Sequence, residues 1–364
     1  MSDFLIVGGG VVGLLLAREL AFAGATVTVL ERGRCFREAS WAGGGIVSPL
    51  YPWRYPDAVT ALADWAQAFY PQLAASLLRE TAIDPELVRT GLLMLEAEDE
   101  DEALVWAERS SRLMVKVDSS FIHHHEAMLA DGFSHGLWME DVANIRNPRL
   151  GQALIKSLRA MSAVTLLEQT ELISIAGSKN HVQALELASG SRKLKMSAGN
   201  YVITAGAWSG VILSKTAKPV PVVPVKGQML LYKTETPLLK SIVLKKGRYL
   251  IPRKDGHILV GSTLEYAEFD KSTTEDALQS LKHSAIDMLP ELRKYEPLQQ
   301  WAGLRPSSPG GIPFIGNVPG YDNLYVNAGH FRNGLVLAPA SARLLADILL
   351  RNTPVVDPAP YRLL

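Results

Sequence analysis

The sequence predicts an α/β protein, α+β overall, in which a parallel sheet covered by helices is joined to a largely antiparallel sheet. At the N-terminus the apolar run Phe4–Val7 is followed by a glycine-rich turn, an apolar stretch of helical length, Val11–Ala23, and a second apolar run, Ala25–Leu30. This order is typical of a β-α-β unit. In residues 220–263, several short runs alternate without helices between them, which favours antiparallel strands.

The glycine-rich turn between the first strand and helix indicates dinucleotide binding. Gly8 permits a tight turn, Gly10 lets the backbone approach a pyrophosphate, and Gly13 lets the helix pack on the strand. The free N–H groups of the helix N-terminus face the phosphates. Glu31, which ends the second strand, can accept hydrogen bonds from ribose hydroxyls and would repel a 2′-phosphate. The motif therefore disfavours NADP and leaves NAD and FAD open.

Composition excludes several classes of protein. The chain has 364 residues, 48% of them hydrophobic and 20% charged, so we expect two globular parts with a large core. The formal net charge is zero, which disfavours a nucleic-acid partner. The single cysteine, Cys35, excludes an internal disulfide and fits a reducing compartment. We see no secretory signal and no apolar run of about 18 residues, and so expect a cytoplasmic protein without stable membrane insertion.

The first half of the chain offers one more close-approach element and one metal candidate. Ser40–Ser48 contains three consecutive glycines, which would let backbone lie against a flat ligand. We expect a helix over Asp57–Glu80, a strand over Leu92–Leu95 and a solvated helix start in Glu96–Glu102. The three consecutive histidines His123–His125 suggest a metal-binding site, but consecutive side chains point in different directions, so we expect no metal site.

The second half contains the remaining expected elements. Tyr201–Gly206 is a buried strand that ends in small residues, a second place where backbone can approach a cofactor. We expect Lys226-Gly227 to form a bulge or bend, and Gly303–Pro306 to open a loop. The other expected helices and strands are Arg149–Ala160, Val164–Glu168, Leu172–Ile175, Val182–Glu186, Lys193–Met196, Val220–Tyr232, a hairpin of Gly247–Arg253 and His257–Thr263, Thr274–Leu289, Asn323–Asn327 and Leu335–Leu350.

Several motifs occur in an order that resembles the FAD-dependent D-amino-acid oxidase superfamily. They are Gly8–Gly13 with Glu31, Ser40–Ile46, Thr204-Ala205-Gly206, Lys226-Gly227-Gln228, Tyr249 with Pro252-Arg253, Gly303–Pro306 and Gly329–Gly334. Within the superfamily, the order and length resemble most the bacterial glycine oxidases of thiamine biosynthesis. The resemblance covers essentially the whole chain.

The resemblance implies an FAD-binding Rossmann domain of the glutathione-reductase type with an inserted antiparallel-sheet substrate domain. We expect the FAD-binding domain in residues 1-83, 141-218 and 300-364, and the substrate domain in 84-140 and 219-299. The expected FAD-binding residues are Gly8, Gly10, Val12, Gly13, Glu31, Arg32, Ser40, Gly44, Gly45, Ile46, Leu172, Thr204, Ala205, Gly206, Trp208, His330, Phe331, Arg332, Asn333, Gly334 and Leu335. FAD is expected to be non-covalent, because Cys35 lies early in the chain rather than late.

The resemblance also implies the substrate site and the reaction. Arg305 would bind the substrate carboxylate as a bidentate fork, Tyr249 would donate a hydrogen bond to it, and Arg332 would line the site. The α-hydrogen would pass as hydride to flavin N5, and the imine would hydrolyse to an oxo acid and ammonia. Dioxygen would then yield hydrogen peroxide. No acid–base residue is assigned, because a neutral amine needs none.

Two departures from the family pattern concern the substrate pocket. Leu264 stands where the compared pattern has a methionine over the pocket, and Gly247 stands where it has a histidine. Both would change pocket size and polarity, which leaves the preferred amine open. The alternatives are a D-amino-acid dehydrogenase with a respiratory acceptor, a sarcosine-type secondary-amine oxidase, and a non-catalytic flavin-binding protein. A homo-oligomer is expected from the resemblance alone.

Overall fold

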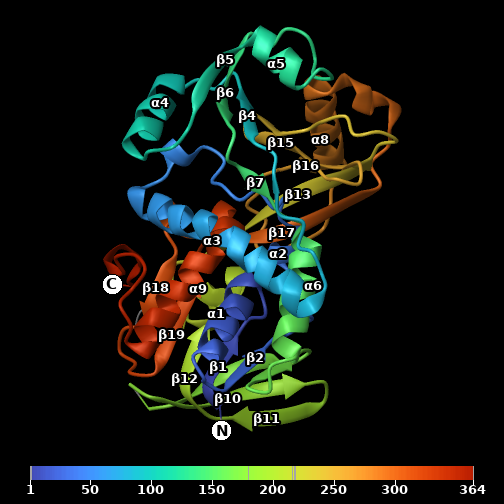
Figure 1. Cartoon of the computed structure of the whole chain (residues 1–364). Coiled ribbons are helices and arrows are strands. Elements are labelled where there is room, and N and C mark those ends of the chain that lie inside the picture. The colour runs from blue at the N-terminus through green and yellow to red at the C-terminus, as the bar shows by residue number, and fades with distance from the viewer. Residues whose placement is uncertain (1, 179, 215, 217–218, 364) are drawn as a thin grey trace.

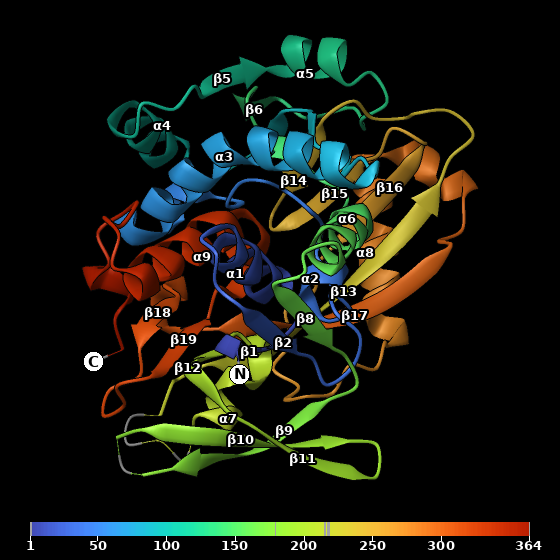
Figure 2. The same cartoon turned by 60° about the horizontal axis from the view of Figure 1, so that its bottom comes forward.

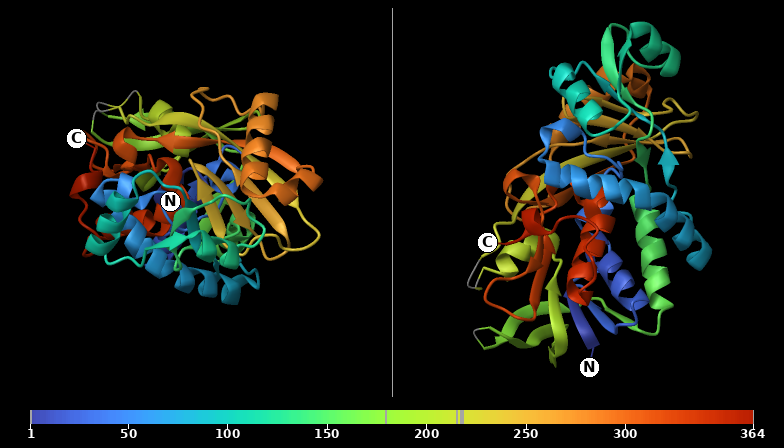
Figure 3. Two further views of the ribbon diagram at one scale, coloured as in Figure 1. Left: turned by 90° about the horizontal axis from the view of Figure 1, so that it is seen from above. Right: turned by 60° about the vertical axis from the view of Figure 1, so that its left-hand side comes forward.

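The chain builds two large sheets that lie at opposite ends of the molecule. The structure is a computed structural model that describes residues 2–178, 180–214, 216 and 219–363. Figure 1 shows the parallel sheet in the lower part and the antiparallel sheet in the upper part, with α3 (Asp57–Thr81) lying between them. The side view in Figure 3 shows the same arrangement. The N-terminal strand therefore lies far from the top of the antiparallel sheet.

The lower sheet is the predicted parallel sheet. Its strands run in the order β18-β19-β12-β1-β2-β8, all parallel except the β18-β19 pair. Their bounds are β18 Phe314–Asn317, β19 Leu324–Ala328, β12 Ala198–Ile203, β1 Ser2–Val7, β2 Val27–Leu30 and β8 Val164–Leu167. The β-α-β unit formed by β1, α1 (Val11–Phe22) and β2 is confirmed.

Side chains alternate along β1 and so serve two apolar cores. Phe4 and Ile6 pack into a core with the helices, whereas Leu5 and Val7 pack with the three-stranded sheet on the other face. The helices of the first face are α1, α3, α6 (Asn147–Arg159) and α9 (Gly334–Leu350), as Figure 2 shows. The three-stranded sheet is the expected meander, β9 Glu171–Gly177, β10 Val182–Ser189 and β11 Arg192–Met196.

The upper sheet has eight strands in the order β17-β13-β16-β15-β14-β4-β6-β5, antiparallel except for the β14-β4 pair. The strands are β17 Gln299–Ser307, β13 Val223–Lys233, β16 His257–Gly261, β15 Arg248–Pro252, β14 Ile242–Lys245, β4 Leu92–Leu95, β6 His135–Met139 and β5 Val115–Asp118. Further elements are the short pair β3 Val88–Arg89 and β7 Ala143–Asn144, and helices α2 Ala39–Ala42, α4 Glu100–Arg109, α5 Ser119–His125, α7 Ser209–Ile212 and α8 Glu275–Met288.

Two local predictions are wrong. Gly303–Pro306 is not a loop but part of β17, which pairs with β13 in an unbroken register from Val223↔Ser307 to Leu231↔Gln299. β17 is an edge strand, where a proline is tolerated. The same register contains no bulge at Lys226-Gly227. The predicted hairpin of β15 and β16 is confirmed.

Helix α9 contains a proline whose missing donor is replaced by a tyrosine. Pro339 has no N–H to give to the carbonyl of Leu335, four residues earlier. The buried hydroxyl of Tyr70, on α3, donates to that carbonyl at 2.5 Å. This hydrogen bond ties α3 to the first turn of α9.

Among the described residues, the region Phe331–Leu350 is also the one helix apolar and long enough to suit a membrane span, but it is mostly buried in this core.

We expect Tyr70→Phe to lower the free energy of unfolding by about 1 kcal/mol, because the Leu335 carbonyl in the α9 helix would lose its donor. Urea denaturation of the variant measures this loss. Tyr266→Phe, at a side chain that is 81% exposed, is the control and should leave stability unchanged. Equal stability of the two variants would contradict this role for Tyr70.

Candidate active site

A cavity of about 650 Å³ lies where the carboxyl ends of the parallel strands meet the antiparallel sheet. The last residues of β1 and β2, Val7 and Leu30, line it together with Thr204 after β12. Open α/β sheets bind ligands at this edge. Tyr249 of β15 and Arg305 of β17 line the same cavity from the other sheet. The fold therefore brings the glycine turn and the candidate substrate residues to one site.

The glycine turn contains two close backbone contacts that leave no room for a side chain. Gly8 has a φ of +116°, and a Cβ there would lie 2.4 Å from the carbonyl oxygen of Thr204. A Cβ at Gly13 would lie 2.0 Å from the carbonyl oxygen of Gly8. The Thr204 hydroxyl donates to that same oxygen at 2.9 Å. The two glycines thus let the backbone pack closely at the start of α1, where an anion can approach the helix N-terminus.

Glu31 and Ser40 are held beside this turn by backbone N–H groups. The Glu31 carboxylate accepts from Gly9 N at 2.9 Å and from Gly33 N at 2.8 Å. The Ser40 hydroxyl accepts from Val11 N at 2.9 Å. Both side chains line the cavity. Arg32 and Trp208, also in the lining, stack with 4.5 Å between the guanidinium carbon and the ring centre.

The triple-glycine loop passes closely beneath β15. A Cβ at Gly44 would lie 2.7 Å from Cδ1 of Ile251 and 3.3 Å from the ring of Tyr249. Gly45 has a φ of +82°, which favours glycine. The buried Arg253 donates to the Gly44 carbonyl at 2.8 Å and so fixes the loop. Burial lowers the pKa of Arg253 to about 10, with a further lowering from nearby Arg146.

The N-terminal end of α9 completes the wall. His330, Phe331, Arg332, Gly334 and Leu335 line the cavity. The His330 ring is buried and its Nε2 lies 3.0 Å from the Ser341 hydroxyl. Burial lowers the pKa of His330 to about 4, so the ring is neutral at physiological pH. The wall therefore presents the positive end of a helix dipole together with the Arg332 cation.

Arg305 is a guanidinium hydrogen-bonded to neutral acceptors. Its Nη1 donates to the carbonyls of Lys226 and Thr263, both at 3.2 Å, and its Nη2 donates to the Ser262 hydroxyl at 2.7 Å. Among the described residues, no carboxylate lies within ion-pair distance of it. Burial lowers the pKa of Arg305 below its ordinary value, as expected for a cation short of negative charge. Such a group binds a carboxylate strongly.

Gly227 explains how Arg305 lies so close to β13. A Cβ at position 227 would lie 2.1 Å from both terminal nitrogens of Arg305. The predicted bulge is therefore absent, and the strand is regular here. The lack of a side chain at Gly227 makes room for the guanidinium. Tyr249, buried beside this group, points its hydroxyl at Met229 Sδ, 3.2 Å away. Sequence reasoning missed Met229, although strand alternation places it on the same face as Gly227.

The structure brings together most but not all of the expected site residues. Of the FAD candidates, Gly13 and Asn333 do not line the cavity; Gly13 packs on Gly8, and Asn333 occupies the N-cap position of α9 without a side-chain capping hydrogen bond. Of the substrate candidates, Leu264 is 46% exposed and lies outside the lining. Leu172 lines the cavity together with the rest of residues 170–175, which the sequence had not indicated as part of the site.

The cavity suits a dinucleotide. Its lining combines the glycine turn, the Glu31 carboxylate and the α9 N-terminus. Two lining asparagines, Asn147 and Asn327, each have a buried amide oxygen without a partner in the described part of the chain. These oxygens need a donor from a ligand or water. The Cys35 thiol is buried outside the lining, and burial with nearby carboxylates raises its pKa to about 12.

Comparison with known proteins identifies the family. The model of the "FAD dependent oxidoreductase" (DAO) family matches residues 3–348, so the chain belongs to this family and is an FAD-dependent oxidoreductase. The predicted FAD cofactor, the α/β fold class and the resemblance to the D-amino-acid oxidase superfamily are thereby confirmed.

The similar proteins include glycine oxidases and bifunctional ThiO/ThiG proteins. The chain is 52% identical to "Glycine oxidase" of Pseudomonas aeruginosa over 357 residues, which cover 98% of this chain and 97% of that protein. It is 30% identical to "Bifunctional protein ThiO/ThiG" of Nostoc sp. over 96% of this chain and 53% of that protein. Its structure superimposes on crystalline glycine oxidase from Geobacillus kaustophilus with a TM-score of 0.92, at 28% identity over 100% and 98% of the two chains.

We expect Gly13→Ala to weaken FAD binding at least about tenfold, because the added Cβ would overlap the Gly8 carbonyl and displace the turn from the phosphates. FAD content after purification and titration of the apoenzyme by flavin fluorescence measure this. Gly33→Ala is the matched control, since a Cβ there meets only an ordinary contact at 3.7 Å. Wild-type FAD affinity in Gly13→Ala would show that the close approach is dispensable.

Proposed function

We propose that the chain oxidises glycine and other small amines or D-amino acids to the imine, which hydrolyses to an oxo acid and ammonia. One observation carries this proposal: the Arg305 guanidinium lines the cavity with neutral partners only, beside the Tyr249 hydroxyl. A substrate carboxylate supplies the negative charge that this guanidinium lacks. The names of the glycine oxidase relatives support the same substrate.

The side chains bind and orient the substrate rather than transfer its protons. Arg305 holds the carboxylate, Tyr249 donates a hydrogen bond to it, and Arg332 adds a second positive charge. Met229, in contact with the Tyr249 hydroxyl, gives the pocket an apolar wall that excludes water. Bound FAD supplies the acceptor for the hydride from the substrate Cα. The protein's part is to fix the orientation of the Cα–H bond, and a neutral amine needs no general base.

The proposed FAD-binding residues divide by the part of the cofactor that they would meet. Gly8, Gly10, Val12 and the α1 N-terminus would face the pyrophosphate, and Glu31 the ribose. Gly44, Gly45 and Ile46 would lie against the flat ring system. The N–H groups at the start of α9 would face its polar end. Gly13 would act through its packing on Gly8, and Asn333 through its position at the start of α9.

The two sheets support a division of the chain into an FAD-binding domain and a substrate-binding domain. We assign FAD binding to residues 1-83, 141-218 and 300-364, and substrate binding to 84-140 and 219-299. The parallel sheet lies wholly in the first set. Most of the antiparallel sheet lies in the second, and β17 carries Arg305 from the first set into that sheet.

The wider role follows from the relatives. The ThiO/ThiG proteins support a place in thiamine biosynthesis, where the imine or its hydrolysis product would be consumed. We further propose dioxygen as the electron acceptor with hydrogen peroxide as product, a cytoplasmic location, and a homo-oligomeric state.

The proposed reaction is tested by adding glycine, sarcosine and D-alanine in turn to the purified yellow enzyme without oxygen, followed by air. We expect an amino acid to bleach the flavin, and air to restore the colour with formation of peroxide. Bleaching that air does not reverse would indicate a dehydrogenase with another acceptor. A response to sarcosine alone would indicate a secondary-amine oxidase, and no response would contradict the proposed function.

We expect Arg305→Ala to keep the yellow colour but to raise KM for amino acids by orders of magnitude, a loss of about 3 kcal/mol of charge-assisted bonding. Steady-state kinetics with the best substrate measure this. Arg343→Ala, at a partly exposed arginine paired with Glu19, is the control. A near-normal KM in Arg305→Ala would remove that residue from carboxylate binding.

A further inference from the structure

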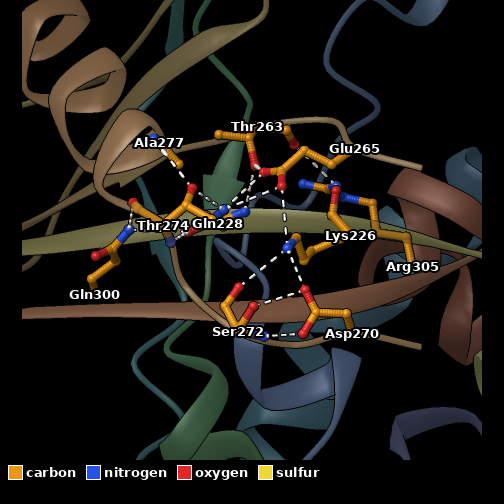
Figure 4. Close-up of polar contacts among 10 residues, drawn as sticks. All are labelled: Lys226, Gln228, Thr263, Glu265, Asp270, Ser272, Thr274, Ala277, Gln300 and Arg305. Atoms are coloured by element: carbon orange, nitrogen blue, oxygen red, sulfur yellow. Dashed lines mark hydrogen bonds and ion pairs between the residues drawn. The ribbon is translucent and has the colours of Figure 1, made fainter. Parts of the chain in front are cut away.

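Lys226 is a buried cation on β13, on the opposite face of the strand from Arg305, the proposed substrate-binding residue. Its side chain on β13 is almost fully buried, and its Nζ lies 3.0 Å from Asp270 Oδ2, 3.2 Å from the Ser272 carbonyl and 3.3 Å from Glu265 Oε2. Figure 4 shows the ammonium between the two carboxylates, with Arg305 beside Glu265. Because successive side chains of a strand point to opposite faces, Lys226 and Arg305 use opposite sides of the Gly227 backbone.

The residues that Lys226 binds belong to one segment, which we call the strap: residues 262–274, between β16 and α8. Lys226 and Glu265 also exchange two backbone hydrogen bonds, of 2.8 Å and 3.0 Å. The Thr263 hydroxyl donates to Glu265 at 2.5 Å, and the buried Gln228 amide donates to the same carboxylate at 2.9 Å. The strap is thus fixed to β13 by a closed polar network.

The same strap holds Arg305. Two of the three acceptors of its guanidinium, the Thr263 carbonyl and the Ser262 hydroxyl, are strap atoms, and the third is the carbonyl of Lys226 itself. A shift of the strap would therefore move the acceptors that orient the guanidinium. The orientation of Arg305 depends on how the strap is anchored.

Charge adds a second constraint. Glu265 brings a negative charge near Arg305, and its field acts to raise the pKa of that guanidinium against the larger, opposing effect of burial. Burial by itself would lower the pKa of Lys226, but the two carboxylates hold it above its ordinary value. Lys226 thereby satisfies both carboxylates. Without it, Glu265 would keep its Thr263 and Gln228 donors but lose its cation, while the nearby Arg305 guanidinium has no carboxylate partner.

We propose that Lys226 is a positioning residue for carboxylate recognition: it binds Glu265 and Asp270, fixes the strap, and so leaves Arg305 oriented and available for the substrate. This inference rests on the proposed role of Arg305. It assigns a function to the Lys226-Gly227-Gln228 motif: Gly227 makes room for the guanidinium, while Lys226 and Gln228 hold the segment that orients it.

The test measures acetate binding to the holoenzyme through its effect on the flavin absorbance, because acetate presents a carboxylate without a reacting amine. We expect Lys226→Met to weaken acetate binding about tenfold or more and to raise KM, with a smaller effect on kcat. The double variant Lys226→Met/Glu265→Gln removes the competing carboxylate as well. We expect it to recover part of the lost affinity, because it removes the charge competition but does not restore the strap anchor.

Lys271→Met is the matched control, since Lys271 is a strap lysine that pairs with Glu38 and does not touch the Arg305 acceptors. It should bind acetate as the wild type does. Should Lys226→Met not fold, Lys226→Gln keeps a donor for the Ser272 carbonyl and gives the same comparison. Wild-type affinity in the single variant, or no recovery in the double variant, overturns the proposal. If Arg305→Ala also binds acetate normally, the proposed function itself fails.

Discussion

The pairing of β13 with β17 brings a half-buried guanidinium against a strand that has no side chain at the point of contact. Gly227 makes this possible, because any Cβ there would overlap both terminal nitrogens of Arg305. The guanidinium then finds only neutral acceptors, so its charge is compensated when a carboxylate enters the cavity. The antiparallel sheet, its edge strand and the strap are all arranged around this one group.

The dinucleotide end of the cavity depends on a different constraint, the absence of side chains where three backbone segments meet. Gly8, Gly13 and Thr204 approach within distances that exclude a Cβ, and Thr204 bonds the Gly8 carbonyl. The α9 N-terminus closes the other wall, and Tyr70 replaces the donor that Pro339 lacks. The two constraints meet in one cavity, which brings the glycine turn and the Arg305 guanidinium to the same space.

Local patterns predicted the elements whose chemistry is local. The β-α-β unit, the hairpin of β15 and β16 and the long helix α3 follow from periodicity and turn residues. Gly303–Pro306 was wrong because glycine and proline favour a loop, whereas pairing with β13, distant in sequence, makes the segment an edge strand. Strand β18 was missed for a similar reason, since its partner β19 alone defines it.

The site could be predicted where motifs carry it and not where packing decides. Arg305 and Tyr249 followed from the family resemblance, and both line the cavity. Leu264 was expected over the pocket but is not among the residues that line it, whereas Met229 lines the pocket without any motif. Lys226 belonged to a motif, yet its partners on the strap are up to 46 residues away along the chain. Tertiary contacts of this kind leave no periodic signal.

A crystal structure of the enzyme with FAD and acetate would show whether Arg305 receives the carboxylate. We expect the acetate carboxylate to lie on the Arg305 guanidinium, within hydrogen-bond distance of the Tyr249 hydroxyl, while Lys226 still binds Glu265 and Asp270. Acetate bound away from Arg305, or Arg305 turned to Glu265 with the ligand elsewhere, would contradict this expectation.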